Sequence, residues 1–183
     1  MLLKDLRDEA AKLARSIHDE VVQVLLSHLI EIIKYTNSKV ELEVLLDSLM
    51  TDRCTYWHIV NKHEYMPDIV LLCKYGSSLA SVILMEIALT LRRVADVIPR
   101  LKRVSQLLSE KLRTKIIPIV IYVYDRESVK GVFFDKIKQY VLDAKQDISR
   151  LEEPIILITS LDRTDIENCA KKIAEIITAT VNS

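Results

Sequence analysis

The sequence predicts an α/β fold in which helices flank a mixed β-sheet. Three observations carry this prediction. Apolar residues recur every three or four positions over the first 36 residues, as on one face of a long helix. Two apolar runs around a short turn at residues 75–79 predict an antiparallel hairpin. The almost entirely apolar run at residues 116–124 is typical of a central strand covered on both faces.

The remaining elements follow from the same periodicities. Asn37 and Ser38 end the first helix, and residues 40–50 resemble a second, short helix. The chain should then form a strand at 55–60, the hairpin, a helix at 92–113, the strand at 116–124, a helix at 129–149, a strand at 154–159 and a helix at 165–181. Because a helix connects the hairpin to the buried strand, the sheet should combine antiparallel and parallel pairs.

Two local signals refine the helices. Pro99 lies inside the helix at 92–113 and should kink it or mark a restart. Residues 164–167, Thr-Asp-Ile-Glu, have the pattern of a capping box at the start of the last helix. In terms of domains, residues 1–50 are expected to form a helical region that packs on or projects from the core. Residues 51–183 are expected to form the α/β domain.

Composition narrows the classes of protein. A chain of 183 residues is long enough to bury a real core, and its 26 basic and 26 acidic side chains balance. Contacts with nucleic acid must therefore come from local patches. No apolar run reaches the roughly 20 residues of a membrane span, and the charged start does not resemble a secretory signal. These features favour a soluble, cytoplasmic protein that does not interact with membranes.

Two further features of composition indicate the environment of the protein. The three cysteines are widely spaced without a Cys-x-x-Cys pair, so buried thiols are expected instead of disulfides or a zinc site. The two glycines and the abundance of Ile, Val, Lys and Glu are typical of a thermophilic protein.

The strongest functional signal is a pair of acids, Asp68 and Glu86, each set in an apolar run. If the turn centres near Ser77, the two residues are opposed in the hairpin, with Cβ atoms roughly 4.5–5.5 Å apart. Two carboxylates that close require a proton, a base or a metal ion between them. Alternatively, either acid lies at a sheet edge or pairs with an arginine such as Arg92. His63 is the histidine nearest to the pair in sequence.

The stretch from Pro67-Asp-Ile-Val through Ile83-Leu-Met-Glu-Ile-Ala to Ile116-Ile-Pro-Ile-Val resembles the PD-(D/E)XK nuclease superfamily. It is most similar to archaeal nuclease-like proteins with a helical N-terminal region. The resemblance covers roughly residues 15–125. It implies a restriction-endonuclease-like core of order α-β-β-β-α-β, preceded here by a long helix and followed by an α-β-α extension.

The resemblance also implies a set of metal ligands. Asp68 matches the aspartate of the motif and Glu86 its second acid. Both would bind a divalent metal, Mg²⁺ or Mn²⁺, together with the backbone carbonyl of Ile87. Some relatives add a glutamate from the first helix, for which Glu20 and Glu31 are the candidates.

The motif lysine is replaced by Ala88 in this chain. Lys74 is expected to project from the same face of its strand, but it lies roughly 20 Å from Asp68 along an extended chain. Arg92 or Arg93 could reach back from the start of the following helix. A guanidinium is a poor general base, however, so the resemblance implies a nuclease with impaired hydrolysis.

The segment at residues 92–115 is strongly basic, with eight Lys or Arg against two acids. Such a surface can neutralise the phosphates of a nucleic acid. The side chains expected to make these contacts are those of Arg92, Arg93, Arg100, Lys102 and Arg103. The alternative is a solvated helix face whose apolar side packs on the sheet.

Three functions are therefore weighed. The first is a nuclease-fold protein that binds nucleic acid, with impaired metal-dependent phosphodiester hydrolysis. The second is a non-catalytic interaction or scaffold protein on a degenerate nuclease fold. It would form a homodimer or bind a partner through the apolar stripe of the first helix, Leu3, Leu6, Ala10, Leu13, Ile17 and Val24. The third, a small-ligand-binding α/β domain, lacks a glycine-rich phosphate loop.

Overall fold

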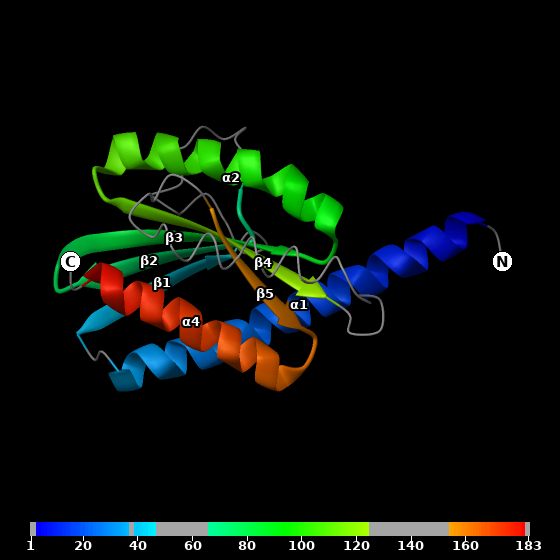
Figure 1. The fold of residues 1–183 in the computed structure, drawn as a ribbon, viewed down its shortest axis with the longest axis horizontal. Helices are drawn as coiled ribbons and strands as arrows, with labels where there is room; N and C mark the ends of the chain where they lie inside the picture. The colour runs from blue at the N-terminus through cyan, green and yellow to red at the C-terminus, as the bar shows by residue number, and fades with distance from the viewer. Residues whose placement is uncertain (1–2, 37–38, 47–65, 125–153, 182–183) are drawn as a thin grey trace.

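The computed structural model describes residues 3–36, 39–46, 66–124 and 154–181. In these residues a five-stranded mixed sheet is flanked by three helices, as Figure 1 shows. The elements are α1 (Leu3–Thr36), β1 (Val40–Leu46), β2 (Ile69–Tyr75), β3 (Ser78–Ala88), α2 (Leu91–Leu112), β4 (Lys115–Tyr124), β5 (Ile155–Ser160) and α4 (Arg163–Val181). The predicted α/β class is confirmed.

The strands lie in chain order, β1-β2-β3-β4-β5. The pairs β1–β2 and β2–β3 are antiparallel, whereas β3–β4 and β4–β5 are parallel. The parallel pair β3–β4 is connected by α2, as a parallel pair requires a crossover. The sheet is therefore mixed, as the order of elements predicted.

The sheet is covered on both faces (Figure 1). Helices α1 and α4 pack on one face, and α2 packs on the other. Alternate strand residues point to opposite faces. In β2, Leu71 belongs to the core under α1 and α4, while Leu72 belongs to the core under α2.

The predicted hairpin is confirmed, including its register. Ile69 pairs with Met85 and Val70 with Leu84, and the same register continued by one residue places Asp68 opposite Glu86. Gly76 in the turn has a φ of 60°, a left-handed conformation that glycine adopts without steric cost. A register shift between Cys73 and Lys74 is confined to the turn end of the hairpin.

The basic helix and the central strand are also confirmed. Thr90 caps α2 by accepting a hydrogen bond from the backbone N–H of Arg93. The helix continues through Pro99, so of the two predicted effects of this proline, a kink or a restart, the restart does not occur. Its apolar stripe anchors it to the sheet on both sides of the proline, through Val94, Val97, Leu101, Val104 and Leu108. The interior of β4 is buried throughout, as expected of a strand covered on both faces.

The short helix expected at residues 40–50 is wrong for residues 40–46. This segment is the edge strand β1, which pairs with β2. Its sequence alternates apolar residues with Glu41 and Glu43, and the two glutamates are exposed. A period of two residues, not of 3.6, therefore decides the structure here.

The start of α4 also differs from the prediction. The helix begins at Arg163, before the expected capping box. The Asp162 carboxylate accepts a hydrogen bond from the N–H of Thr164, so Asp162 is the capping side chain. The strand predicted at 55–60 and the helix predicted at 129–149 lie outside the described residues. Among the helices that are described, none has an apolar stretch sufficient to cross a bilayer.

Candidate functional site

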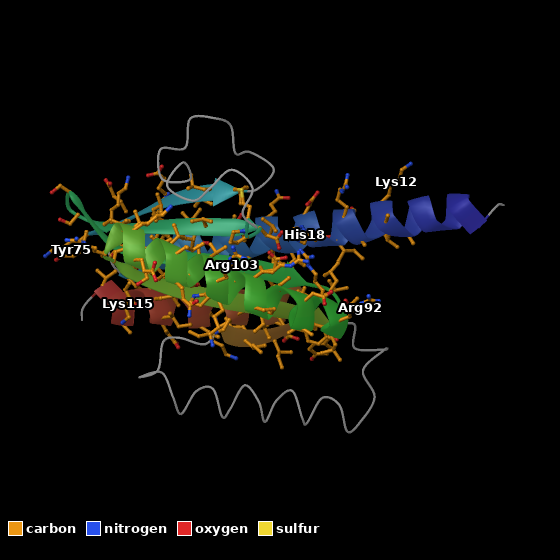
Figure 2. All side chains as sticks on the ribbon, turned by 90° about the horizontal axis from the view of Figure 1, so that it is seen from above. Lys12, His18, Tyr75, Arg92, Arg103 and Lys115 are labelled. Atoms are coloured by element: carbon orange, nitrogen blue, oxygen red, sulfur yellow. The ribbon has the colours of Figure 1, made fainter. Side chains whose placement is uncertain are left out.

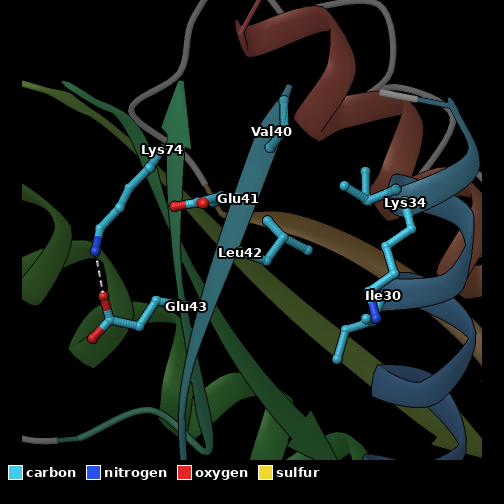
Figure 3. A pocket seen from close by; sticks show the side chains of 8 residues that line it. Ile30, Lys34, Val40, Glu41, Leu42, Glu43 and Lys74 are labelled. Atoms are coloured by element: carbon cyan, nitrogen blue, oxygen red, sulfur yellow. Dashed lines mark hydrogen bonds and ion pairs between the residues drawn. The ribbon is translucent and has the colours of Figure 1, made fainter. Parts of the chain in front are cut away.

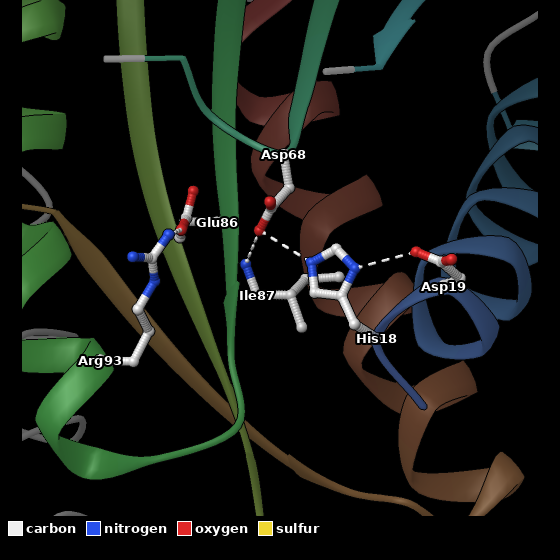
Figure 4. Close-up of polar contacts among 6 residues, drawn as sticks. All are labelled: His18, Asp19, Asp68, Glu86, Ile87 and Arg93. Atoms are coloured by element: carbon white, nitrogen blue, oxygen red, sulfur yellow. Dashed lines mark hydrogen bonds and ion pairs between the residues drawn. The ribbon is translucent and has the colours of Figure 1, made fainter. Parts of the chain in front are cut away.

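Asp68 lies directly before β2 and is held from two sides. Its Oδ2 accepts a hydrogen bond of 2.7 Å from the backbone N–H of Ile87 in β3. The same oxygen lies 3.1 Å from Nε2 of His18 in α1. Figure 4 shows the carboxylate between the two partners. Asp68 therefore joins the end of the β2–β3 hairpin to the first helix.

Glu86 is a buried carboxylate in β3, with only 1% of its side chain exposed. Its Oε1 lies 2.5 Å from Nη2 of Arg93, in the first turn of α2 (Figure 4). The Arg93 side chain is 45% exposed, so the ion pair spans from the sheet interior to solvent. The pairing with an arginine that the sequence left open is found here, with Arg93 in place of Arg92.

The two acids have separate partners, in opposite layers of helices. The hairpin register and the bond from Asp68 to the residue after Glu86 place them at the same end of the sheet. Asp68 is paired with α1, and Glu86 with α2. Each acid therefore has a basic side chain as its partner, and the two partners come from opposite layers of helices.

His18 is the site residue that sequence reasoning missed. It is 50 positions from Asp68, so no local spacing signals the contact, and the residue nearest in sequence, His63, lies outside the described residues. The hydrogen bond to Asp68 raises the pKa of His18 above its usual value, although partial burial opposes this. The Asp19 carboxylate, 3.3 Å from Nδ1, adds to the rise.

The other residues that the sequence offered for the site have three different surroundings. Ala88 is completely buried in the apolar cluster beneath the start of α2, where it lies beside Val94 and Tyr122. Lys74 pairs with Glu43 at 2.6 Å, at the turn end of the hairpin. Glu20 and Glu31 are exposed on α1.

The basic residues of α2 lie along its outer side. Arg92, Arg93, Arg100 and Arg103 are exposed, and Lys102 is half-buried. Figure 2 shows Arg92 and Arg103 on this helix, with Arg92 at the end toward the projecting part of α1. The predicted basic surface therefore begins beside the acidic pair.

The chemistry of the donors fits a hard divalent cation. Mg²⁺ is usually bound by one or two carboxylates together with retained waters, and Asp68 and Glu86 supply two carboxylates at one end of the sheet. No cluster of three or more His, Cys, Asp or Glu side chains suited to a metal occurs within the described residues. Within these residues the two carboxylates are therefore the candidate ligands.

A cleft and two cysteines are further places where a ligand could bind or a nucleophile could act. A cleft of about 520 Å³ lies between α1 and the edge strand β1, and none of the predicted metal-binding or nucleic-acid-binding residues lines it (Figure 3). Cys73 and Cys169 are buried thiols, as expected. Burial raises the pKa of Cys73 to about 11 and that of Cys169 to about 12, so both are protonated at neutral pH and are poor nucleophiles.

Comparisons with family models, with curated proteins and with solved structures each give no match to this chain.

Proposed function

We propose that this chain is a nuclease-fold protein that binds nucleic acid beside the Asp68–Glu86 pair, with impaired metal-dependent phosphodiester hydrolysis. The observation that carries the proposal is the position of the two acids at one end of the hairpin, with Glu86 paired to Arg93 in the first turn of a basic helix. A carboxylate pair close to a positive surface is the arrangement that a phosphodiester and its cation require.

The order of the elements supports the same proposal. The described elements run α1-β1-β2-β3-α2-β4, which is the α-β-β-β-α-β order implied by the resemblance to PD-(D/E)XK nucleases. Among the described elements, the first strand of this order is β1. The acids also occupy the places that the motif implies, before the second strand and near the end of the third.

Each residue has a defined part in this proposal. Asp68 and Glu86 would hold Mg²⁺ or Mn²⁺, with the backbone carbonyl of Ile87. When bound, such an ion polarises the phosphate and lowers the pKa of a coordinated water. Arg92 and Arg93 would contact the phosphates. Hydrolysis is impaired because Ala88 supplies no ammonium group and an arginine side chain stays protonated.

Thermal unfolding with and without Mg²⁺ or Mn²⁺ tests the metal site. An ion whose free concentration is about 100 times its Kd stabilises the folded state by about 2.7 kcal/mol, which raises Tm by several degrees. The rise should occur in the wild type and vanish in the Asp68→Ala, Glu86→Ala double variant. Glu43→Gln, which removes a paired carboxylate from the turn end of the same sheet, is the matched control and should keep the rise. An equal rise in the double variant rejects the site.

Binding of DNA and RNA oligonucleotides at several salt concentrations tests the basic surface. Replacing Arg100, Lys102 and Arg103 by alanine should lower the slope of log affinity against log salt by about three, if each contacts one phosphate. The matched control is Lys171→Ala with Lys172→Ala, two exposed lysines on α4. A salt profile that is already flat in the wild type argues against nucleic acid as a partner.

One observation favours the second function, an interaction protein that dimerises through α1. The N-terminal part of α1 projects beyond the sheet (Figure 1), and residues 10–16 are all exposed. Leu13 is 63% exposed and lies on the stripe predicted to pair. Exposed apolar residues on one side of a helix, here Ala10 and Leu13, are suited to pack against a second copy.

Measurement of the mass in solution tests this second function. Leu13→Glu should convert a dimer to a monomer, because it introduces a charge into the proposed seam. Lys12→Glu, also exposed on the same turn but off the stripe, should leave the mass unchanged. If the wild-type chain is already monomeric, dimerisation through α1 is rejected.

A further inference from the structure

We propose that the Arg93–Glu86 ion pair is a latch on the metal site. The guanidinium neutralises Glu86 in the absence of a divalent cation. When the cation is bound, the guanidinium is released to a phosphate of the nucleic acid. This inference rests on the proposed function, since it concerns the regulation of the same acidic pair.

The first step of the argument is competition for one oxygen. Oε1 of Glu86 already lies 2.5 Å from Nη2 of Arg93, and the carboxylate is 1% exposed. A divalent cation on the same carboxylate would stand within a few ångströms of the guanidinium. At that separation two positive charges repel strongly, most of all away from solvent. A metal ion that binds Glu86 must therefore displace the Arg93 guanidinium from the carboxylate.

The second step is that only a side chain has to move. The backbone at Arg93 is fixed, because its N–H donates to Oγ1 of Thr90 and the N–H of Val94 donates to the Thr90 carbonyl. The guanidinium reaches Glu86 from the partly exposed side, so it has a path into solvent. A lysine at position 88 would have no such path, since Ala88 is enclosed by apolar residues.

The third step is the destination of the guanidinium. The first turn of α2, residues 91–94, carries Arg92 and Arg93 and no acid. Its helix N-terminus favours a negative charge, and guanidinium groups bind phosphates with two parallel hydrogen bonds. The released Arg93 would therefore add to a phosphate site beside the metal. By linkage, metal and nucleic acid then increase each other's affinity.

The test is a Mn²⁺ titration followed by Tm, and a nucleic-acid titration with and without Mn²⁺, on wild type and Arg93→Ala. Removing the competitor should lower the midpoint of the metal titration about tenfold. The same variant should bind a DNA oligonucleotide more weakly, and the effect of Mn²⁺ on that affinity should shrink. Arg163→Ala, which breaks an arginine–glutamate pair on α4, is the matched control and should change neither.

The possible results separate the latch from the proposed function. A metal response with an unchanged or higher midpoint in Arg93→Ala overturns the latch and leaves the metal site standing. No response at millimolar Mn²⁺ in wild type and variant overturns both. A response in Arg93→Ala alone supports the latch, because it shows that the guanidinium excludes the metal. If Arg93→Ala fails to fold, Arg93→Gln removes the charge while keeping a hydrogen-bond donor, and the same outcomes apply.

Discussion

The two ends of the β2–β3 hairpin each carry an ion pair. The two pairs have almost the same N–O distance but differ in how far their side chains are buried. At the turn end, Lys74 and Glu43 are 2.6 Å apart, with 30% and 44% of their side chains exposed. At the site end, Arg93 and Glu86 are 2.5 Å apart, but Glu86 is almost completely buried. Distance alone therefore does not reveal which pair matters.

Burial gives the two pairs different consequences. An exposed pair gains little, because water screens the charges and two long side chains lose conformational freedom. A buried carboxylate has lost its hydration and depends on its partner to compensate for that loss. The turn-end pair should therefore be dispensable, and the site-end pair should constrain the fold around it.

Arg93→Ala should give the largest effect on stability. It removes a guanidinium from a buried carboxylate, and we expect a loss of about 2 kcal/mol in the free energy of unfolding. Urea unfolding at neutral pH without added metal measures it. A loss below about 0.5 kcal/mol, as for a surface pair, would mean that the two ends of the hairpin are energetically alike.

His18→Gln should give an intermediate effect that depends on pH. The pKa of His18 is raised in the folded protein above the 6.5 of an unperturbed histidine, chiefly by its hydrogen bond to Asp68. The stabilisation is therefore complete below pH 6.5 and is lost as the pH rises through the folded-state pKa. We expect the wild type to be more stable than the variant by about 0.5–1 kcal/mol near pH 6, with the difference vanishing at high pH.

Unfolding curves of wild type and His18→Gln between pH 5 and pH 9 check this prediction. Asp68→Asn provides the control, because without the carboxylate the pH dependence contributed by His18 should largely disappear. A difference that stays constant across this range would show that His18 contributes by packing and not by charge.

Lys74→Ala should give the smallest effect. Both members of its pair are partly exposed, so the loss should stay below about 0.5 kcal/mol and should decrease further in high salt. Chemical unfolding at low and high salt measures it. A loss comparable with that of Arg93→Ala would contradict the distinction between the two ends.

The sequence was informative where structure follows from local periodicity. The hairpin register, the buried strand β4 and the apolar face of α2 all come from spacings within about 20 residues. The strand β1 was misjudged because Val40, Val44 and Leu45 also suit a helical face. Pairing with β2, some 30 residues away, decides between the two structures.

The candidate site divides in the same way. Arg93 is seven positions from Glu86, so its reach back to the sheet could be anticipated from the hairpin and the helix start. His18 is 50 positions from Asp68, and their contact depends on how α1 packs across the sheet. A tertiary contact of this kind leaves no spacing in a single sequence.

Helix α1 is continuous from its projecting part to the part that packs on the sheet. Leu13, exposed on the projecting part, and His18, bonded to Asp68, are five residues apart, about 7.5 Å along the helix axis. Val21, about one turn further along α1, is buried in the core, so the packed part of the helix begins close to His18. If the projecting part of α1 binds a second copy as proposed, a displacement there would be transmitted along one continuous helix to His18 and so to Asp68. The same helix carries both the surface proposed for assembly and a side chain of the candidate site.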